Sequence, residues 1–147
     1  MFQLRDYTPE DFEEIWILDQ ICFARGIAYT RPELRHFLLE PSAITIVASA
    51  DGRIAGFVLV DIDRKGGHII TIDVHPDYRR TGLGSKLMQE AEGRLGASGV
   101  SEVRLEVAVD NSTAIAFYKR RGYFVMKSIL RYYNDSIDAL LMHKRLD

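Results

Sequence analysis

A basic turn punctuated by glycines joins an apolar strand to a helix in the middle of this 147-residue chain. The run that ends at Val74 is apolar and β-branched, which is typical of a buried strand. After Gly84 the apolar residues recur at helical spacing, beginning with Leu87 and Met88. A strand that enters a helix through so short a turn leaves the first backbone N–H groups of the helix unpaired and directed at one spot. Because the helix dipole favours negative charge there, the turn predicts a phosphate site.

The turn itself reads Arg79-Arg80-Thr81-Gly82-Leu83-Gly84. Its two glycines let a ligand approach the backbone because they carry no Cβ, and its two arginines add charge and forked donors. Lys86-Leu87 stands where a mononucleotide loop needs Lys-Ser or Lys-Thr, and Leu87 also replaces the third glycine of a dinucleotide fingerprint. We therefore predict a diphosphate cradle of another kind. A plain helix entry beside a solvated arginine pair is the alternative.

Composition limits the class of protein. The 147 residues, 47% of them hydrophobic, suffice for one well-buried domain and are too few for two of ordinary size. Apolar stretches such as Ile54–Val60 are far shorter than the roughly 20 residues that span a bilayer, and the acidic Glu10-Asp11 near the start is unlike a secretory signal. A net charge of -2 gives no general attraction to nucleic acid or to acidic membranes. The lone cysteine, Cys22, reads as a packed thiol in a reducing compartment, so we expect a soluble cytoplasmic domain.

Hydrophobic periodicity predicts an α/β (α+β) fold, with one domain over residues 1–147. Helices are expected to begin at Thr8, at Thr30, after Gly84 and at Asn111, the last one running to about Arg121. Strands are expected at Phe2–Arg5, Ala43–Ser49, Ile54–Ile62, in the run ending at Val74, and at Glu102–Val109, Tyr123–Tyr132 and Ile137–Lys144. This order predicts a mixed central sheet of about seven strands with helices on both faces.

Two motifs in this order carry a resemblance to a known family. The turn fits the pattern Arg/Gln-x-x-Gly-x-Gly, and Asn111 to Tyr118 fits Asn-x-x-Ala-x-x-x-Tyr, followed by the exit Gly122-Tyr123. Both resemble motifs of the GCN5-related N-acetyltransferase (GNAT) superfamily. Within it, the chain is most similar to protein N-terminal acetyltransferases of the ribosomal-protein-alanine and Ard1 type. That likeness rests on Gly67-His68-Ile69, on Leu105-Glu106-Val107 and on the tail Arg131-Tyr132-Tyr133-Asn134-Asp135 with Asp138 to Met142.

The resemblance implies acetyl-CoA as the acyl donor and no metal. The four histidines and one cysteine also show no metal-ligand spacing. In this family the central strand separates from its neighbour near Val74, whose freed N–H would bind the acetyl carbonyl, a contact worth up to about 3 kcal/mol. The residues that the resemblance assigns to the cofactor are Ile72, Val74, Arg79, Arg80, Thr81, Gly82, Leu83, Gly84, Ser85, Asn111 and Tyr118.

The resemblance also implies three catalytic residues. Tyr118 would donate a proton to the leaving thiolate as general acid; a core tyrosine with its hydroxyl bonded to backbone is the alternative. Glu106 is the first choice for the general base, with an ion pair to Arg104 or to another basic side chain as the alternative. His68 is a rival or a helper, since a histidine titrates near neutral pH, although it could also be a turn residue after Gly66-Gly67.

The expected acceptor is a primary amine, most plausibly the α-amine of a protein or peptide. An α-amine with a pKa of about 8 is roughly a tenth neutral at pH 7, whereas a lysine amine is neutral only to a few parts in ten thousand. One carboxylate is therefore adequate for an N-terminus. By resemblance, Phe23, Tyr29, Tyr132 and Tyr133 would contact the substrate; ordinary strand aromatics are the alternative for the last two.

Other functions stay open at this point. The loop from Phe23 to Pro32 lacks the Phe-Pro and nearby Ser common in relatives, and its Arg25 and Arg31 would either favour an acidic group or be solvated. A small-molecule amine acetyltransferase and a non-catalytic acyl-CoA-binding module are therefore alternatives. The expected partners are acetyl-CoA and a peptide N-terminus, without nucleic acid or membrane, for a monomer or a homodimer.

Overall fold

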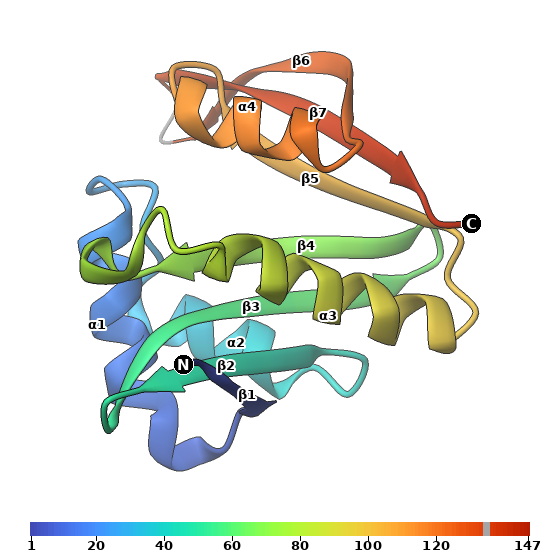
Figure 1. Ribbon diagram of the computed structural model, residues 1–147. Coiled ribbons are helices and arrows are strands. Elements are labelled where there is room, and N and C mark those ends of the chain that lie inside the picture. Colours follow the sequence, from blue (N-terminus) through green and yellow to red (C-terminus); the bar gives the residue numbers. More distant parts are fainter. Residues whose placement is uncertain (134–135) are drawn as a thin grey trace.

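The computed structural model describes residues 1–133 and 136–147 and places every described strand in one sheet (Figure 1). The sheet has seven strands in the order β1-β2-β3-β4-β5-β7-β6. The strands are β1 (Gln3–Asp6), β2 (Ile44–Ala50), β3 (Arg53–Asp63), β4 (Gly66–Val74), β5 (Glu102–Ala108), β6 (Phe124–Tyr133) and β7 (Ile137–Arg145). The predicted seven-stranded mixed sheet is confirmed, with boundaries shifted by one or two residues. Asn134 and Asp135, in the predicted last turn and in the family-like tail, lie outside the described residues.

Side-chain caps mark two of the described α-helix starts. They are α1 (Phe12–Cys22), α2 (Arg31–Leu39), α3 (Leu83–Ala97) and α4 (Ser112–Arg120), with short 3-10 turns η1 (Pro9–Asp11) and η2 (Pro76–Tyr78). The Thr30 side chain accepts a hydrogen bond from the Glu33 N–H, and Asn111 accepts one from the Ala114 N–H. The predicted helix start at Thr8 opens η1 rather than α1 itself, and α1 follows directly at Phe12.

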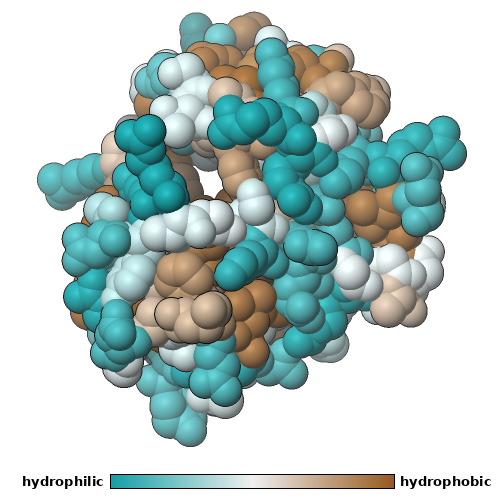
Figure 2. Space-filling model, in the orientation of Figure 1, coloured by the Kyte–Doolittle hydropathy of each residue, from teal (hydrophilic) through white to brown (hydrophobic). Residues whose placement is uncertain are grey.

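The pairing of β4 with β5 is parallel and very short. Neighbouring strands elsewhere in the sheet are antiparallel, whereas β4 and β5 pair only at Gly67 with Val103 and at His68 with Arg104. Beyond His68 the two strands diverge, so their ribbons separate toward the end of β4 (Figure 1). The space-filling view in the same orientation has an opening through the molecule in that region (Figure 2). The sequence before Val74 therefore builds a strand whose last residues have a partner only on the β3 side.

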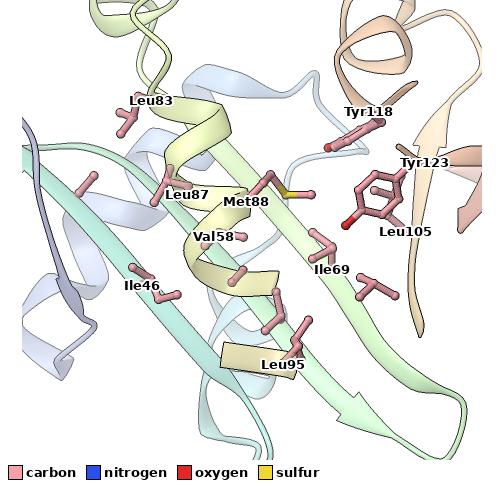
Figure 3. Packing of buried hydrophobic residues seen from close by; sticks show 14 of the residues in the cluster. Ile46, Val58, Ile69, Leu83, Leu87, Met88, Leu95, Leu105, Tyr118 and Tyr123 are labelled. Atoms are coloured by element: carbon pink, nitrogen blue, oxygen red, sulfur yellow. The ribbon is translucent and has the colours of Figure 1, made fainter. Parts of the chain in front are cut away.

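Helices cover both faces of the sheet, as predicted (Figure 1). On one face, Leu87, Met88 and Leu95 of α3 are fully buried against β2, β3 and β4 (Figure 3). Burying each such side chain stabilises the fold by about 1.5–3 kcal/mol. On the other face, α1 and α2 pack a second cluster that includes Ile15 and Leu34 against β2 and β3. The central strands are thus enclosed on both faces, which holds the open end of β4 in place.

A buried polar cluster fastens the β5–β7 half of the sheet to α3. The Glu92 carboxylate of α3 accepts hydrogen bonds from Tyr123 Oη at 2.8 Å, Lys144 Nζ at 2.9 Å and Arg121 Nη2 at 3.2 Å. Its side chain is 10% exposed. Since β4 and β5 share only two residue pairs, this cluster supplies a second connection between the two halves of the sheet.

Strand β6 forms one edge of the sheet, and its ladder with β7 is irregular. The register shifts between Val125 and Lys127 and again between Ile129 and Tyr133. Arg131 has φ +53, and its N–H donates to Asp138 Oδ1 at 2.9 Å. Several large apolar side chains of this strand are exposed, namely Phe124, Val125, Met126, Leu130 and Tyr132.

Candidate active site

The predicted cradle lies at the start of α3. Gly82 precedes the helix with φ +83, a conformation that favours glycine, and a Cβ at this position would meet no atom within 4 Å. The first helical hydrogen bond is donated by the Lys86 N–H to the Gly82 carbonyl at 3.1 Å. The amides of Leu83, Gly84 and Ser85 therefore belong to the first turn, where backbone N–H groups lack partners within the helix. This geometry suits an anion.

Three residues of the turn, which were expected to contact a ligand, also make contacts within the protein. A Cβ at Gly84 would lie 3.3 Å from the Phe117 ring, so this glycine also permits close packing of α4 against the turn. The Leu83 side chain is buried in the core, which leaves only its backbone for a ligand. The Thr81 hydroxyl donates to the Tyr78 carbonyl at 2.5 Å and stabilises the turn.

The Arg79 guanidinium points toward the end of β4. Its Nε donates to the Val74 carbonyl at 3.1 Å, and Nη2 lies 3.6 Å from Cys22 Sγ. The Cys22 thiol donates to the same Val74 carbonyl at 3.4 Å. Cys22 is therefore a packed thiol, as predicted, and burial raises its pKa to about 12. Arg79 holds the backbone at Val74 in this structure, while Arg80, at φ +62, keeps the loop bent.

The backbone N–H of Val74 faces the gap between β4 and β5. The following N–H, that of His75, donates to the Ala55 carbonyl of β3 at 2.8 Å. Because successive N–H groups of a strand point to opposite sides, the Val74 N–H points away from β3. The ladder with β5 has ended by this residue. A donor thus faces the opening, as the family geometry implies.

Tyr118 lies on α4 with its hydroxyl directed toward the α3 side (Figure 3). The residue is 9% exposed, and its ring makes edge contacts with Phe117 and Tyr123. Within residues 1–133 and 136–147, the phenol has no hydrogen-bond partner, so the alternative of a hydroxyl bonded to backbone is not observed. Burial, and then the charge of Asp73, raise the pKa of Tyr118 above its usual value. The phenol therefore stays protonated at neutral pH.

The two candidate bases touch one another. His68 Nε2 of β4 lies 2.6 Å from Glu106 Oε1 of β5, and the side chains are 20% and 14% exposed. Arg104, the partner considered for Glu106, instead makes a two-pronged contact with Asp63 at 2.6 and 3.1 Å. His68 lies within β4 and not in the turn that precedes it. His68 pairs with Arg104 in the ladder, and Glu106 lies two residues further along the same face of β5, which brings His68 and Glu106 together.

A pair of tyrosines from β6 borders the Glu106 carboxylate. The Tyr132 and Tyr133 rings meet edge to face with centroids 4.8 Å apart, and the Tyr133 hydroxyl donates to the Glu106 carbonyl at 3.2 Å. Burial, followed by the Glu106 carboxylate, raises the pKa of Tyr132 to about 12. Burial likewise raises the pKa of Tyr133, so both phenols are neutral at physiological pH, and the Tyr133 hydroxyl, whose proton is used on Glu106, can still accept a hydrogen bond from a ligand.

The loop between α1 and α2 holds Tyr29 against β4. Its N–H donates to Asp19 Oδ2 at 2.8 Å and its hydroxyl to the Ile70 carbonyl of β4 at 3.3 Å. Arg31 pairs with Glu13 at 2.8 Å and lies over the Trp16 ring at 3.9 Å. Phe23, directly after α1, is half-buried, as are Ile72 of β4 and Asn111.

Two buried acids near the site were not predicted as site residues. Asp73 of β4 is 1% exposed and Asp19 of α1 is completely buried. The signal was present in the sequence, because Asp73 interrupts an otherwise apolar run and Asp19 follows apolar residues of a buried helix face. In a dry environment a carboxylate requires partners, so such positions merit attention in any sequence.

Comparison with known proteins agrees with this geometry. Residues 6–123 match the profile of the Acetyltransferase (GNAT) family. An uncharacterized N-acetyltransferase of Methanocaldococcus jannaschii is 38% identical over 97% of this chain and 90% of its own length. An N-alpha-acetyltransferase of Sulfurisphaera tokodaii is 36% identical over 96% and 91%, respectively. The crystal structure of Ard1 from Thermoplasma volcanium superimposes with a TM-score of 0.90 at 28% identity, covering 99% and 98% of the two chains.

The chain belongs to the GNAT family of acetyltransferases and is an N-acetyltransferase. The predicted family and its likeness to N-terminal acetyltransferases are both confirmed. None of the described helices has the length and apolar character needed to cross a bilayer.

Proposed function

We propose that this enzyme transfers an acetyl group from acetyl-CoA to the N-terminal α-amine of a protein or peptide, by direct attack in a ternary complex. The observation that carries the proposal is the contact between His68 of β4 and Glu106 of β5, at the point where the two strands diverge. Beyond that point the Val74 N–H points away from β3, and the Tyr118 hydroxyl of α4 makes no hydrogen bond within the described residues.

The residues present fit acetyl-CoA. The side of Gly82 on which a side chain would stand is open, and the first turn of α3 presents N–H groups to the pyrophosphate. Ser85 and Arg80 are polar groups of the same turn. The family resemblance assigns Ile72 and Asn111 to the parts of acetyl-CoA beyond the pyrophosphate. Bound acetyl-CoA would supply an activated thioester carbonyl.

The chemistry assigned to the protein consists of one hydrogen bond and two proton transfers. Val74 N–H donates to the carbonyl oxygen, where negative charge develops during attack. Glu106, held by His68, takes the proton that the amine nitrogen loses as the C–N bond forms. Tyr118 gives its proton to the sulfur as the C–S bond breaks. The electron pair of the amine thus ends in the amide and that of the C–S bond in the thiol.

An α-amine suits this machinery better than a lysine amine. It is neutral in a far larger fraction at pH 7, so a single carboxylate paired with a histidine suffices. The relatives with similar sequence include an N-alpha-acetyltransferase. Tyr132 and Tyr133 lie beside Glu106 and would provide hydroxyl groups for the backbone of the first substrate residues.

The test is mass spectrometry of a peptide library, with free N-termini and internal lysines, after incubation with acetyl-CoA. Acetyl groups confined to α-amines would support the proposal, and the modified sequences would define the preferred first residue. A second library with blocked N-termini serves as the control. Acetylation of lysines alone, or of added small amines alone, would overturn the choice of acceptor. Binding of acetyl-CoA without any turnover would favour a non-catalytic acyl-CoA-binding module.

A further inference from the structure

Two buried carboxyl groups face each other behind the reaction site. Asp19 lies on α1 and is 0% exposed, whereas Asp73 lies on β4, one residue before Val74, and is 1% exposed. The Cys22 thiol, about one helical turn after Asp19, donates to the Val74 carbonyl next to Asp73 at 3.4 Å, so α1 packs against this end of β4. Two carboxylates in an apolar interior repel one another and lose their hydration, so the fully ionised pair would be strongly unfavourable.

The remaining contacts of these acids indicate which atoms meet. Asp19 Oδ2 accepts the Tyr29 N–H at 2.8 Å, and Asp73 Oδ1 accepts the Thr71 hydroxyl at 2.6 Å. Asp19 Oδ1 and Asp73 Oδ2 are buried and receive no donor from the described part of the chain. Ionised carboxyl oxygens are acceptors only, so a hydrogen bond between them requires a proton on one of the two.

We propose that Asp19 and Asp73 share a single proton between Asp19 Oδ1 and Asp73 Oδ2, and that this acid pair positions the Tyr29 loop against the central strand. Asp19 is anchored to the loop through the Tyr29 N–H. Asp73 is anchored to β4 through Thr71. The shared proton is the link between the two anchors.

The charges around the pair are consistent with one proton and one negative charge. Burial, followed by the neighbouring Asp19, raises the pKa of Asp73 well above its usual value, and burial likewise raises that of Asp19. The titratable and charged groups that face the pair from the packed elements are Cys22 of α1, Tyr29 of the loop, Arg79 after β4 and Tyr118 of α4. Arg79 is the cation among them and balances the remaining negative charge.

The position of the pair connects it to substrate binding. The family resemblance assigns Tyr29 to the substrate, and its hydroxyl donates to the Ile70 carbonyl of β4 at 3.3 Å. This part of the inference rests on the proposed function, because it takes Tyr29 to line the acceptor site. Asp19 and Asp73 are then positioning residues, which act on the acceptor through the loop and take no part in proton transfer to the amine.

Asparagine substitutions test the shared proton without measuring activity. In Asp73→Asn the new NH₂ donates to Asp19 Oδ1 and the amide oxygen still accepts from Thr71. Asp19→Asn works in the mirror-image way. Each single variant should therefore melt at or above the wild-type temperature at pH 7. In the double variant two NH₂ groups face each other, and the melting temperature should fall about 3–10 °C below that of either single variant. Single variants that are both strongly destabilised, or additive effects, would overturn the shared proton.

The pH dependence supplies an independent readout. A raised pKa in the folded state means that the stabilising proton is present at low pH and is lost as pH rises through that value. The melting temperature of Asp73→Asn relative to wild type should therefore increase between pH 5 and pH 9. A constant difference would contradict the proposal.

Peptide KM provides the functional part of the test. For the wild type, KM should rise relative to that of Asp73→Asn as the pH increases, with kcat affected less. Asp73→Leu, which cannot make the hydrogen bond, should raise KM at every pH, and Asp73→Asn should restore it. Equal KM values in all three proteins would refute the positioning role. If no substrate is found at all, the proposed function fails while the melting experiments still decide the shared proton.

Discussion

His68 Nε2 and Glu106 Oε1 lie 2.6 Å apart, although the two residues are 38 positions apart in the sequence. The contact joins the two strands just where their pairing ends. The two candidates for the general base are therefore in contact, and each can orient the side chain of the other. Removing one partner therefore changes the placement of the second, so the effect of each single substitution has to be compared with that of the double substitution.

Glu106→Gln should lower kcat/KM for an α-amine peptide by about 10²-fold or more, because a general base is lost. The loss should be deepest at low pH, where less of the amine is neutral. His68→Gln should cost less, and the double variant should be no slower than Glu106→Gln. Glu102→Gln, on the same face of β5, is the control. A loss that is uniform with pH, or confined to His68→Gln, would assign the base to the histidine or to solvent.

Tyr118→Phe should reduce kcat by roughly 10²-fold with little change in acetyl-CoA affinity, since the ring still packs and only the acidic proton is removed. Because burial raises the pKa of Tyr118 above about 10, the ratio of wild-type to variant rate should stay flat between pH 6 and pH 9. Stopped-flow kinetics and calorimetric titration of acetyl-CoA measure the two quantities. An unchanged kcat would remove the general-acid role.

Arg79→Met tests whether this side chain holds Val74 or binds phosphate. The structure places its guanidinium on the Val74 carbonyl, so we expect kcat to fall about tenfold, the effect of one lost charged hydrogen bond, while CoA affinity changes little. Arg80→Met in the same turn is the matched variant. A large drop in CoA affinity for Arg79→Met, accompanied by a weaker salt dependence, would show that the arginine turns to the cofactor on binding.

Gly82→Ala should weaken CoA binding about tenfold, because φ +83 costs a residue with a Cβ roughly 1–2 kcal/mol and the cradle would rearrange. Gly93→Ala provides the control, since this glycine lies inside α3 and its Cβ would meet no atom within 4 Å. That substitution should raise stability by up to about 1 kcal/mol and leave binding unchanged. Equal CoA affinity in both variants would contradict a cradle at Gly82.

Glu92→Ala should lower the free energy of unfolding by about 3 kcal/mol, because it leaves the Lys144 and Arg121 charges without their buried partner. Glu90→Ala, which removes a more exposed carboxylate paired with Arg94, should cost less than about 0.5 kcal/mol. Urea denaturation of the two variants measures the difference. Similar losses would mean that the Glu92 cluster does not join the halves of the sheet.

Local signals in the sequence were sufficient for most of the fold. The caps at Thr30 and Asn111 and the positive φ at Gly82 are encoded by residues within a few positions, and the structure shows each of them. The start at Thr8 was resolved less well, because a capping residue followed by proline is equally compatible with a 3-10 turn and an α-helix.

The contacts of the site depended on register and packing, which no local pattern reveals. The His68–Glu106 contact follows from a parallel ladder of only two residue pairs. The direction of the Arg79 side chain was also beyond prediction, since a guanidinium beside a phosphate cradle has two reasonable targets. The proximity of Asp19 and Asp73 depends on the packing of α1 against β4, which the sequence alone does not reveal.

The irregular ladder of β6 also affects how readily another chain can pair with this edge of the sheet. A ten-residue edge strand with exposed Phe124, Met126 and Leu130 would, if flat, offer a continuous row of hydrogen-bonding groups to another chain. The two register shifts and the positive φ of Arg131 break that row into short pieces. The bends next to Tyr132 and Tyr133 thereby also make the strand a poor template for fibril growth.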